Sequence, residues 1–202
     1  MNRRSAKVQR RTARIERCTK ETSVELELCL DGSGEAQIET GVGFLDHLLG
    51  SLAKHARFDL SLKMQGDLQI DDHHTAEDTA LALGSALDQA LGSREGVLRF
   101  GYAYAPLDEA LARAVVDLSG RPHAEIDLQL QRESLGALAC ENVTHVLRSL
   151  ALASRSTLHV DVLRGSNDHH RAESAFKATA LALRQAISRS AFGDVPSTKG
   201  VL

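Results

Sequence analysis

The stretch D-H-H-T-A-E at residues 72–77 returns in the second half of the chain as D-H-H-R-A-E at residues 168–173. Apolar residues follow each copy at helical spacing, so we expect each stretch to open a helix. On such a helix the first histidine and the glutamate are four residues apart and share a face. The second histidine is turned about 100° from the first and faces a different centre. Each copy therefore offers ligands to two places.

The repeat extends toward the N-terminal side of each copy. F-L-D-H-L-L-G-S-L-A at 44–53 aligns with N-V-T-H-V-L-R-S-L-A at 142–151, which pairs His47 with His145. One copy alone would fit histidines on a solvated helix face, but duplication of the whole pattern favours a metal site. An imidazole and carboxylate mixture suits two divalent transition metal ions, Mn, Fe or Zn, before Mg or Ca. The candidate ligands are His47, His73, His74, Glu77, His145, His169, His170 and Glu173.

Both halves have the same order of predicted elements. The first half has strands expected at 12–20, 22–30, 36–39 and 59–64, and helices at 44–56 and 73–91. The second half has strands expected at 101–104, 110–117, 122–130 and 157–163, and helices at 138–154 and 170–190. This order predicts an α+β fold of two pseudo-symmetric halves, each a mostly antiparallel four-stranded sheet with two helices on one face. The expected divisions are a basic tail (1–10), a first repeat half (11–96), a second repeat half (97–192) and a C-terminal tail (193–202).

Composition excludes several classes of function. The 202 residues carry a net charge of −3, which gives no support to nucleic-acid binding by the whole chain. No apolar run is long enough to span a membrane. The basic start lacks the apolar segment of a secretory signal, and we expect a short solvated tail there. Cys18, Cys29 and Cys140 are widely spaced and odd in number, which favours reduced thiols in a cytoplasmic protein.

A series of longer motifs resembles one enzyme family. The motifs are G-V-G-F-L-D-H at 41–47, G-D-L-Q-I-D-D-H-H-T-A-E-D-T at 66–79, D-L-S-G-R-P at 117–122, N-D-H-H-R-A-E at 167–173, F-K-A at 176–178 and P-S-T-K-G-V-L at 196–202. Together they resemble the imidazoleglycerol-phosphate dehydratase family over nearly the whole chain. The resemblance implies a lyase that dehydrates D-erythro-imidazoleglycerol phosphate to imidazoleacetol phosphate in L-histidine biosynthesis. It also implies two Mn(II) ions per active site, which bind the substrate imidazole as imidazolate, and a homo-oligomeric shell of twenty-four subunits with sites between neighbours.

The same resemblance implies roles for individual residues. One metal would take His73, Glu77, His145 and His170, and the other would take His47, His74, His169 and Glu173. Phosphate binding is implied for Arg99, Arg121, Ser197 and Lys199, with Lys177 as a further candidate. Glu21 matches a substrate-contacting acid and is our candidate acid/base group, with a metal-bound water as the alternative.

Three aspartates lie next to candidate ligands in the sequence. Asp46, Asp72 and Asp168 each precede a histidine, so we expect them to orient imidazole rings as outer partners. Asp72 and Asp168 fit N-capping of the following helix at least as well.

Two other functions remain open from the residues alone. A dinuclear metallohydrolase acting on phosphoesters would use the same ligand types, and it would release phosphate. A structural shell joined by metal ions would have closed sites without affinity for imidazoles. Neither explains the S-T-K tail at 197–199 together with Arg99 and Arg121.

Overall fold

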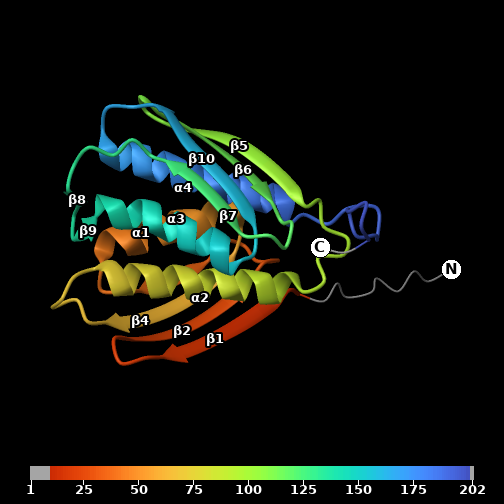
Figure 1. The fold of residues 1–202 in the computed structure, drawn as a ribbon, viewed down its shortest axis with the longest axis horizontal. Helices are drawn as coiled ribbons and strands as arrows, with labels where there is room; N and C mark the ends of the chain where they lie inside the picture. Colours follow the sequence, from red (N-terminus) through yellow and green to blue (C-terminus); the bar gives the residue numbers. More distant parts are fainter. Residues whose placement is uncertain (1–9, 201–202) are drawn as a thin grey trace.

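The structure is a computed structural model that describes residues 10–200. Two four-stranded sheets form the outer layers, and four helices lie between them (Figure 1). Helices α1 and α2 pack against the first sheet, α3 and α4 pack against the second, and the helices also meet in the pairs α1–α4 and α2–α3. Residues 1–9 of the expected basic tail and residues 201–202 lie outside the described part of the chain.

The first half forms the sheet with strand order β1-β2-β4-β3. Its elements are β1 Thr12–Cys18, β2 Thr22–Cys29, β3 Ala36–Glu39, α1 Gly43–Ala56, β4 Asp59–Gly66 and α2 His73–Leu91. Strands β1, β2 and β4 pair antiparallel, whereas β3 pairs parallel with β4 after the chain has crossed through α1. Val24, Leu26 and Leu28 are buried beneath the helices and alternate with exposed glutamates, as a half-buried strand requires.

The second half repeats this topology as β5-β6-β10-β7. Its elements are β5 Phe100–Leu107, β6 Ala110–Asp117, β7 His123–Asp127, α3 Cys140–Ala153, β10 Thr157–Arg164 and α4 Asp168–Ala186. Strand β7 is parallel to β10, just as β3 is parallel to β4. The predicted α+β fold of two similar halves is therefore confirmed.

Strand β5 is longer and β7 shorter than predicted, and two further local features differ from the prediction. A short hairpin of β8 (Ser134–Leu135) and β9 (Leu138–Ala139) precedes α3, and strands of two residues carry no periodic pattern to predict them. Helix α4 ends at Ala186 instead of Ser190, because Ser188 and Ser190 form backbone hydrogen bonds with Leu98 and Gly96. Within the described residues, no helix combines the length and apolar character needed to cross a membrane.

Candidate metal centre

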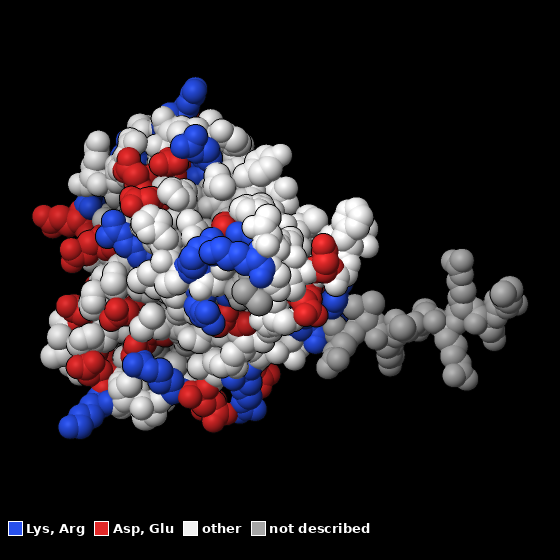
Figure 2. Space-filling view, turned by 45° about the vertical axis from the view of Figure 1, so that its right-hand side comes forward, with Lys and Arg blue, Asp and Glu red and all other residues white. Residues whose placement is uncertain are grey.

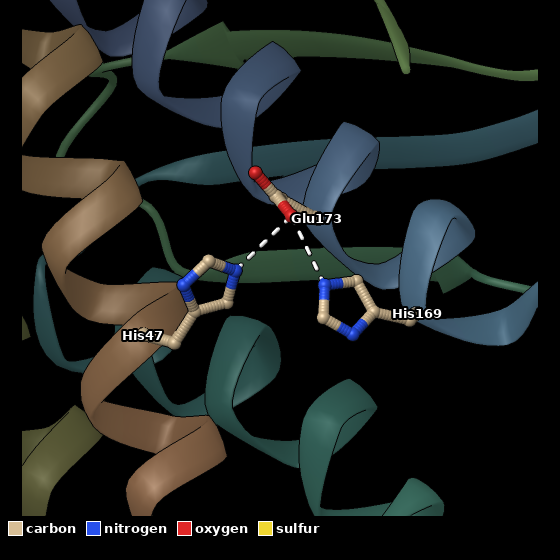
Figure 3. Close-up of side chains that lie close together, drawn as sticks. All are labelled: His47, His169 and Glu173. Atoms are coloured by element: carbon tan, nitrogen blue, oxygen red, sulfur yellow. Dashed lines mark hydrogen bonds and ion pairs between the residues drawn. The ribbon is translucent and has the colours of Figure 1, made fainter. Parts of the chain in front are cut away.

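The first ligand group, here the α1–α4 cluster, consists of His47, His169 and Glu173 (Figure 3). His47 comes from α1, and the other two lie one turn apart on α4. Nε2 of His47 lies 3.0 Å from Oε2 of Glu173, and Nε2 of His169 lies 3.2 Å from the same oxygen. The two rings and the carboxylate therefore converge on one point.

The second group, the α2–α3 cluster, consists of His73, Glu77 and His145. Nε2 of His145 lies 3.2 Å from Oε1 of Glu77, and Nε2 of His73 lies 3.8 Å from Oε2. The imidazole rings of His73 and His145 stack with their centroids 4.9 Å apart. In each cluster the donor atoms lie within 4.8 Å of one another, so each could hold one ion.

The remaining two candidate ligands, His74 and His170, lie outside both clusters. Nδ1 of His74 is 3.1 Å from both carboxylate oxygens of Asp67, and this hydrogen bond raises the pKa of His74. Nδ1 of His170 is 2.7 Å from Oε2 of Glu109; their hydrogen bond raises the pKa of His170 and holds that of Glu109 well below its usual value. The structure thus brings together three members of each implied set of four, and the fourth faces elsewhere.

Lys177 contacts the α1–α4 cluster. Its Nζ lies 2.8 Å from Oε1 of Glu173, while the other oxygen of this carboxylate faces the two histidines. Burial alone would raise the pKa of Glu173, but hydrogen bonds with Lys177 and His47 and their charges lower it to about 2. Burial lowers the pKa of nearby His55, and the charge of Lys177 lowers it further. Glu173 is therefore an anion that is ready to bind a cation.

The three aspartates do not orient the imidazole rings as expected, and the N-capping expected of Asp72 and Asp168 was also wrong. The carboxylate of Asp46 accepts hydrogen bonds from the backbone and hydroxyl of Thr40. Asp72 makes no side-chain cap and accepts the N–H of Ala139 instead. Asp168 is already inside α4, where the side chain of Asn167 is the cap.

The carboxylate of Asp168 has other partners. It accepts the backbone N–H groups of Gln131 and Arg132 and pairs with Arg171. The aspartates beside the ligands thus fix loops around the helix starts and leave the rings to other residues.

The sequence analysis did not identify the side chains that contact the Nδ1 atoms of the candidate ligand histidines. They are Asp67, Glu109 and Asn142, whose Oδ1 lies 3.0 Å from Nδ1 of His73. One signal was available, because Glu109 directly precedes β6 just as Glu21 directly precedes β2. The repeat therefore places a glutamate at the same turn in both halves.

Glu21 lies near a histidine that faces away from the clusters. The turn between β1 and β2 is held by Thr19, whose hydroxyl accepts the backbone N–H groups of Glu21 and Thr22. The Thr22 hydroxyl in turn donates to Asp78 of α2. This arrangement puts a carboxylate oxygen of Glu21 3.9 Å from Nε2 of His74. The Glu21 side chain is 57% exposed and so is accessible to a ligand.

Two of the candidate phosphate ligands, Arg99 and Arg121, lie beside Asp117. Arg99 donates to both oxygens of Asp117, at 2.7 and 3.1 Å, and its Nη1 donates to the carbonyl of Pro196, which ties down the C-terminal tail. Nη2 of Arg121 lies 4.0 Å from Asp117. In the tail, the Ser197 hydroxyl accepts the N–H of Lys199. Figure 2, which turns the C-terminal side of the molecule forward, shows Lys and Arg side chains grouped in the middle of this face.

Four of the five phosphate candidates, all except Lys177, lie at the opposite end of the molecule from the metal clusters. Helix α2 begins at His73 and ends at Leu91, a rise of about 27 Å, and the described part of the tail, which bonds to Gly96 and Arg99, lies near its far end (Figure 1). Arg99 follows that far end, whereas Lys177 lies beside the α1–α4 cluster. Apart from Lys177, a single chain therefore does not bring its phosphate candidates and its ligand clusters within reach of one small molecule.

Comparisons with known proteins point to one family. The family model described as imidazoleglycerol-phosphate dehydratase matches residues 40–183. A protein of that name from Phytophthora nicotianae is 60% identical over 95% of this chain, which spans 42% of that longer protein. Another of that name, from Schizosaccharomyces pombe, is 53% identical over 95% of this chain and all of its own length. The Pyrococcus furiosus structure of this enzyme superimposes with a TM-score of 0.80 and 36% identity, covering 93% of this chain and all of that one. The Staphylococcus aureus structure superimposes with a TM-score of 0.80 and 34% identity, covering 89% of this chain and 99% of that one.

Proposed function

Because the chain belongs to the imidazoleglycerol-phosphate dehydratase family, we propose that it removes water from D-erythro-imidazoleglycerol phosphate to give imidazoleacetol phosphate in L-histidine biosynthesis. The observation that carries the proposal is the pair of ligand clusters at one end of the molecule. Their duplicated histidine and glutamate pattern lies within the part of the chain that matches the family. We place this reaction in the cytoplasm, which three free cysteines favour.

The donor set fits two Mn(II) ions. Each cluster offers two imidazole nitrogens and a carboxylate within 4.8 Å of one another, and these ligand types suit a first-row transition metal. Three ligands per cluster leave positions open for a further protein ligand and for substrate. When bound, such ions supply Lewis acidity that stabilises the substrate's imidazole ring as imidazolate and so eases loss of the hydroxyl. His74 and His170 are the proposed fourth ligands.

The chain's own acid/base group for the proton transfer is Glu21. The reaction must remove a proton from a carbon atom that has no carbonyl next to it. The backbone of Glu21 is held by a turn, and its accessible carboxylate lies beside a proposed ligand, His74. A carboxylate in that position can accept the carbon proton and return it when the enol becomes the ketone.

We propose that sites form between subunits of a homo-oligomer, with twenty-four chains in a shell. Within one chain, the clusters lack their fourth ligands, and the proposed phosphate ligands Arg99, Arg121, Ser197 and Lys199 lie on segments that meet beyond the other end of α2. Neighbouring chains that place one chain's tail beside another's clusters would join the parts. The phosphate contacts would then hold the substrate across the metals.

Incubation of Mn-loaded protein with imidazoleglycerol phosphate, followed by absorbance of imidazoleacetol phosphate at alkaline pH, tests the proposal. We expect product only with metal present. Release of inorganic phosphate from the same substrate would favour the metallohydrolase alternative. Absence of both products, with two ions bound per chain, would favour a purely structural role for the metals.

A further inference from the structure

The two histidines outside the clusters share one contact. Nδ1 of His74 faces the carboxylate of Asp67, and Nδ1 of His170 faces that of Glu109. An ionised carboxylate only accepts hydrogen bonds, so Nδ1 must carry the hydrogen in both rings. When the ring is neutral, this leaves the Nε2 lone pair free. The two rings are therefore held in the form in which Nε2 can bind a metal.

We propose that Asp67 and Glu109 are positioning residues that fix the tautomer and direction of His74 and His170, so that each Nε2 is presented to a ligand cluster of a neighbouring chain. This inference rests on the proposed metal-dependent function. Side chains that hold the far nitrogen of a ligand histidine set its orientation and strengthen metal binding. Neither residue touches a cluster of its own chain, and each would act through its histidine.

The two carboxylates are anchored differently. Oε1 of Glu109 accepts the backbone N–H groups of Ser166 and Asn167 at 3.0 and 2.8 Å, so only Oε2 serves His170. Both oxygens of Asp67 lie 3.1 Å from Nδ1 of His74. An amide at position 67 could turn its oxygen toward Nδ1 without losing other contacts of the carboxylate. An amide at position 109 could not, because two backbone donors already fix where its oxygen must lie.

The two halves use different acidic residues to hold Nδ1 of the histidine outside the clusters, and the repeat shows how their positions are related. Glu109 stands at the same turn position as Glu21, directly before the second strand of its half. In the second half this glutamate holds Nδ1 of the outer histidine. In the first half Asp67 holds Nδ1, so Glu21 is left facing Nε2 of His74 at 3.9 Å. One turn glutamate is thus left for the substrate, and the other is a support for His170.

Paired amide substitutions test the inference. In Glu109→Gln the amide oxygen keeps the bonds to 166 and 167, and the amide NH₂ then donates to Nδ1 of His170. The hydrogen must move to Nε2, which blocks it as a ligand. We expect ¹⁵N spectra of the metal-free, histidine-labelled chain to show this tautomer change, and Mn(II) affinity to fall about 10- to 100-fold at one site. Asp67→Asn should keep the wild-type tautomer and lose less than about tenfold.

The matched control is Glu125→Gln, which alters a glutamate 3.4 Å from the surface histidine His123, away from both clusters. It should leave Mn(II) affinity unchanged. A wild-type tautomer for His170 in Glu109→Gln, or equal Mn(II) affinity in Glu109→Gln and wild type, would overturn the inference. The spectra are recorded without metal, so they test the Nδ1 contact independently of Mn(II) binding. Failure of the wild-type protein to bind Mn(II) would contradict the proposed function and would leave the spectra as the test of this inference. Equal thermal unfolding of the variants shows that folding is not the cause.

Discussion

The two halves of the molecule have the same internal architecture but differ on the outer faces of their sheets. Both have the same strand order and the same pair of helices, and each cluster takes one helix from each half. Helix α1 of the first half meets α4 of the second, and α2 meets α3. Neither half could therefore form a three-ligand cluster alone, although each carries the complete repeated motif. The duplication supplies the ligands, and the packing of the halves assembles them.

The outer faces of the sheets show where the halves have diverged. The first sheet exposes charged residues such as Glu25, Glu27 and Lys63. The second exposes Phe100, Tyr102 and Tyr104 along β5. The residues that face the helices are apolar in both halves, because both sheets pack against the helix layer between them. The outward residues are free of that constraint, so they could acquire separate roles.

The largest predicted effect compares the equivalent glutamates of the two clusters. Glu77→Ala and Glu173→Ala should each remove one bound Mn(II) per chain and abolish dehydration, since each deletes a carboxylate at which two histidines converge. Metal analysis and turnover measure both effects. Glu173→Ala should also lower the free energy of unfolding by about 1 kcal/mol more, because it leaves the mostly buried Lys177 unpaired. Near-wild-type turnover in either variant would count against the ligand assignment.

The next largest effect concerns Glu21, the turn glutamate of the first half. Glu21→Gln should lower kcat by about 100- to 10,000-fold while two Mn(II) ions stay bound, because it removes a general base and no ligand. Steady-state kinetics together with metal analysis make the measurement. An unchanged kcat would mean that another group moves the proton.

A smaller effect concerns the end of the molecule that carries the tail. Lys199→Ala should raise KM for the substrate about tenfold, equal to about 1.4 kcal/mol, because it removes one charged phosphate contact. Mn(II) content should not change, because Lys199 is not one of the proposed metal ligands. If substrate affinity were unaltered, the tail would not belong to the site.

The smallest effect concerns a link between the halves. Arg11 bonds both to Asp31 and to the carbonyl of Ile187, which joins the first sheet to the end of α4. The hydrogen bond with Arg11 lowers the pKa of Asp31 below 3.8. The stability that the ionised Asp31 contributes through Arg11 is therefore complete above pH 3.8. It is lost as the pH falls through the lowered pKa of Asp31 in the folded protein.

Asp31→Asn should consequently reduce the free energy of unfolding by about 1 kcal/mol at neutral pH. The difference from wild type should shrink in acid. Denaturant unfolding at several pH values makes the comparison, and a difference that grew with acidity would contradict the sign.

Helical spacing predicted much of the arrangement. The four-residue interval put His73 with Glu77 and His169 with Glu173 on shared faces, and the neighbouring histidines were expected to face elsewhere. The structure shows both features. Strand alternation likewise predicted the sheets, because one face of each strand must be buried.

What could not be predicted depends on contacts between distant segments. Asp72 looked like a helix cap, but its carboxylate is taken by the N–H of Ala139 in the other half. Asp67 and Glu109 lie in a loop and a turn, where no period shows which side chain will meet a histidine. Similarly, spacing did not reveal that α2 separates Arg99 from the clusters, since that follows from the direction in which the helix runs.

Subunit complementation tests most directly whether active sites are shared. Glu173→Gln removes a ligand, and Arg99→Ala removes a phosphate contact at the other end of the chain. Glu173→Gln alone should be inactive, and Arg99→Ala, which also loses the hydrogen bond that ties the tail down at Pro196, should have little activity at low substrate concentration. If neighbouring chains supply these two residues to one site, random co-assembly of equal amounts should restore about a quarter of wild-type turnover, because about a quarter of sites would then hold both native residues. Turnover of the mixture that stays at the level of the single variants would contradict shared sites.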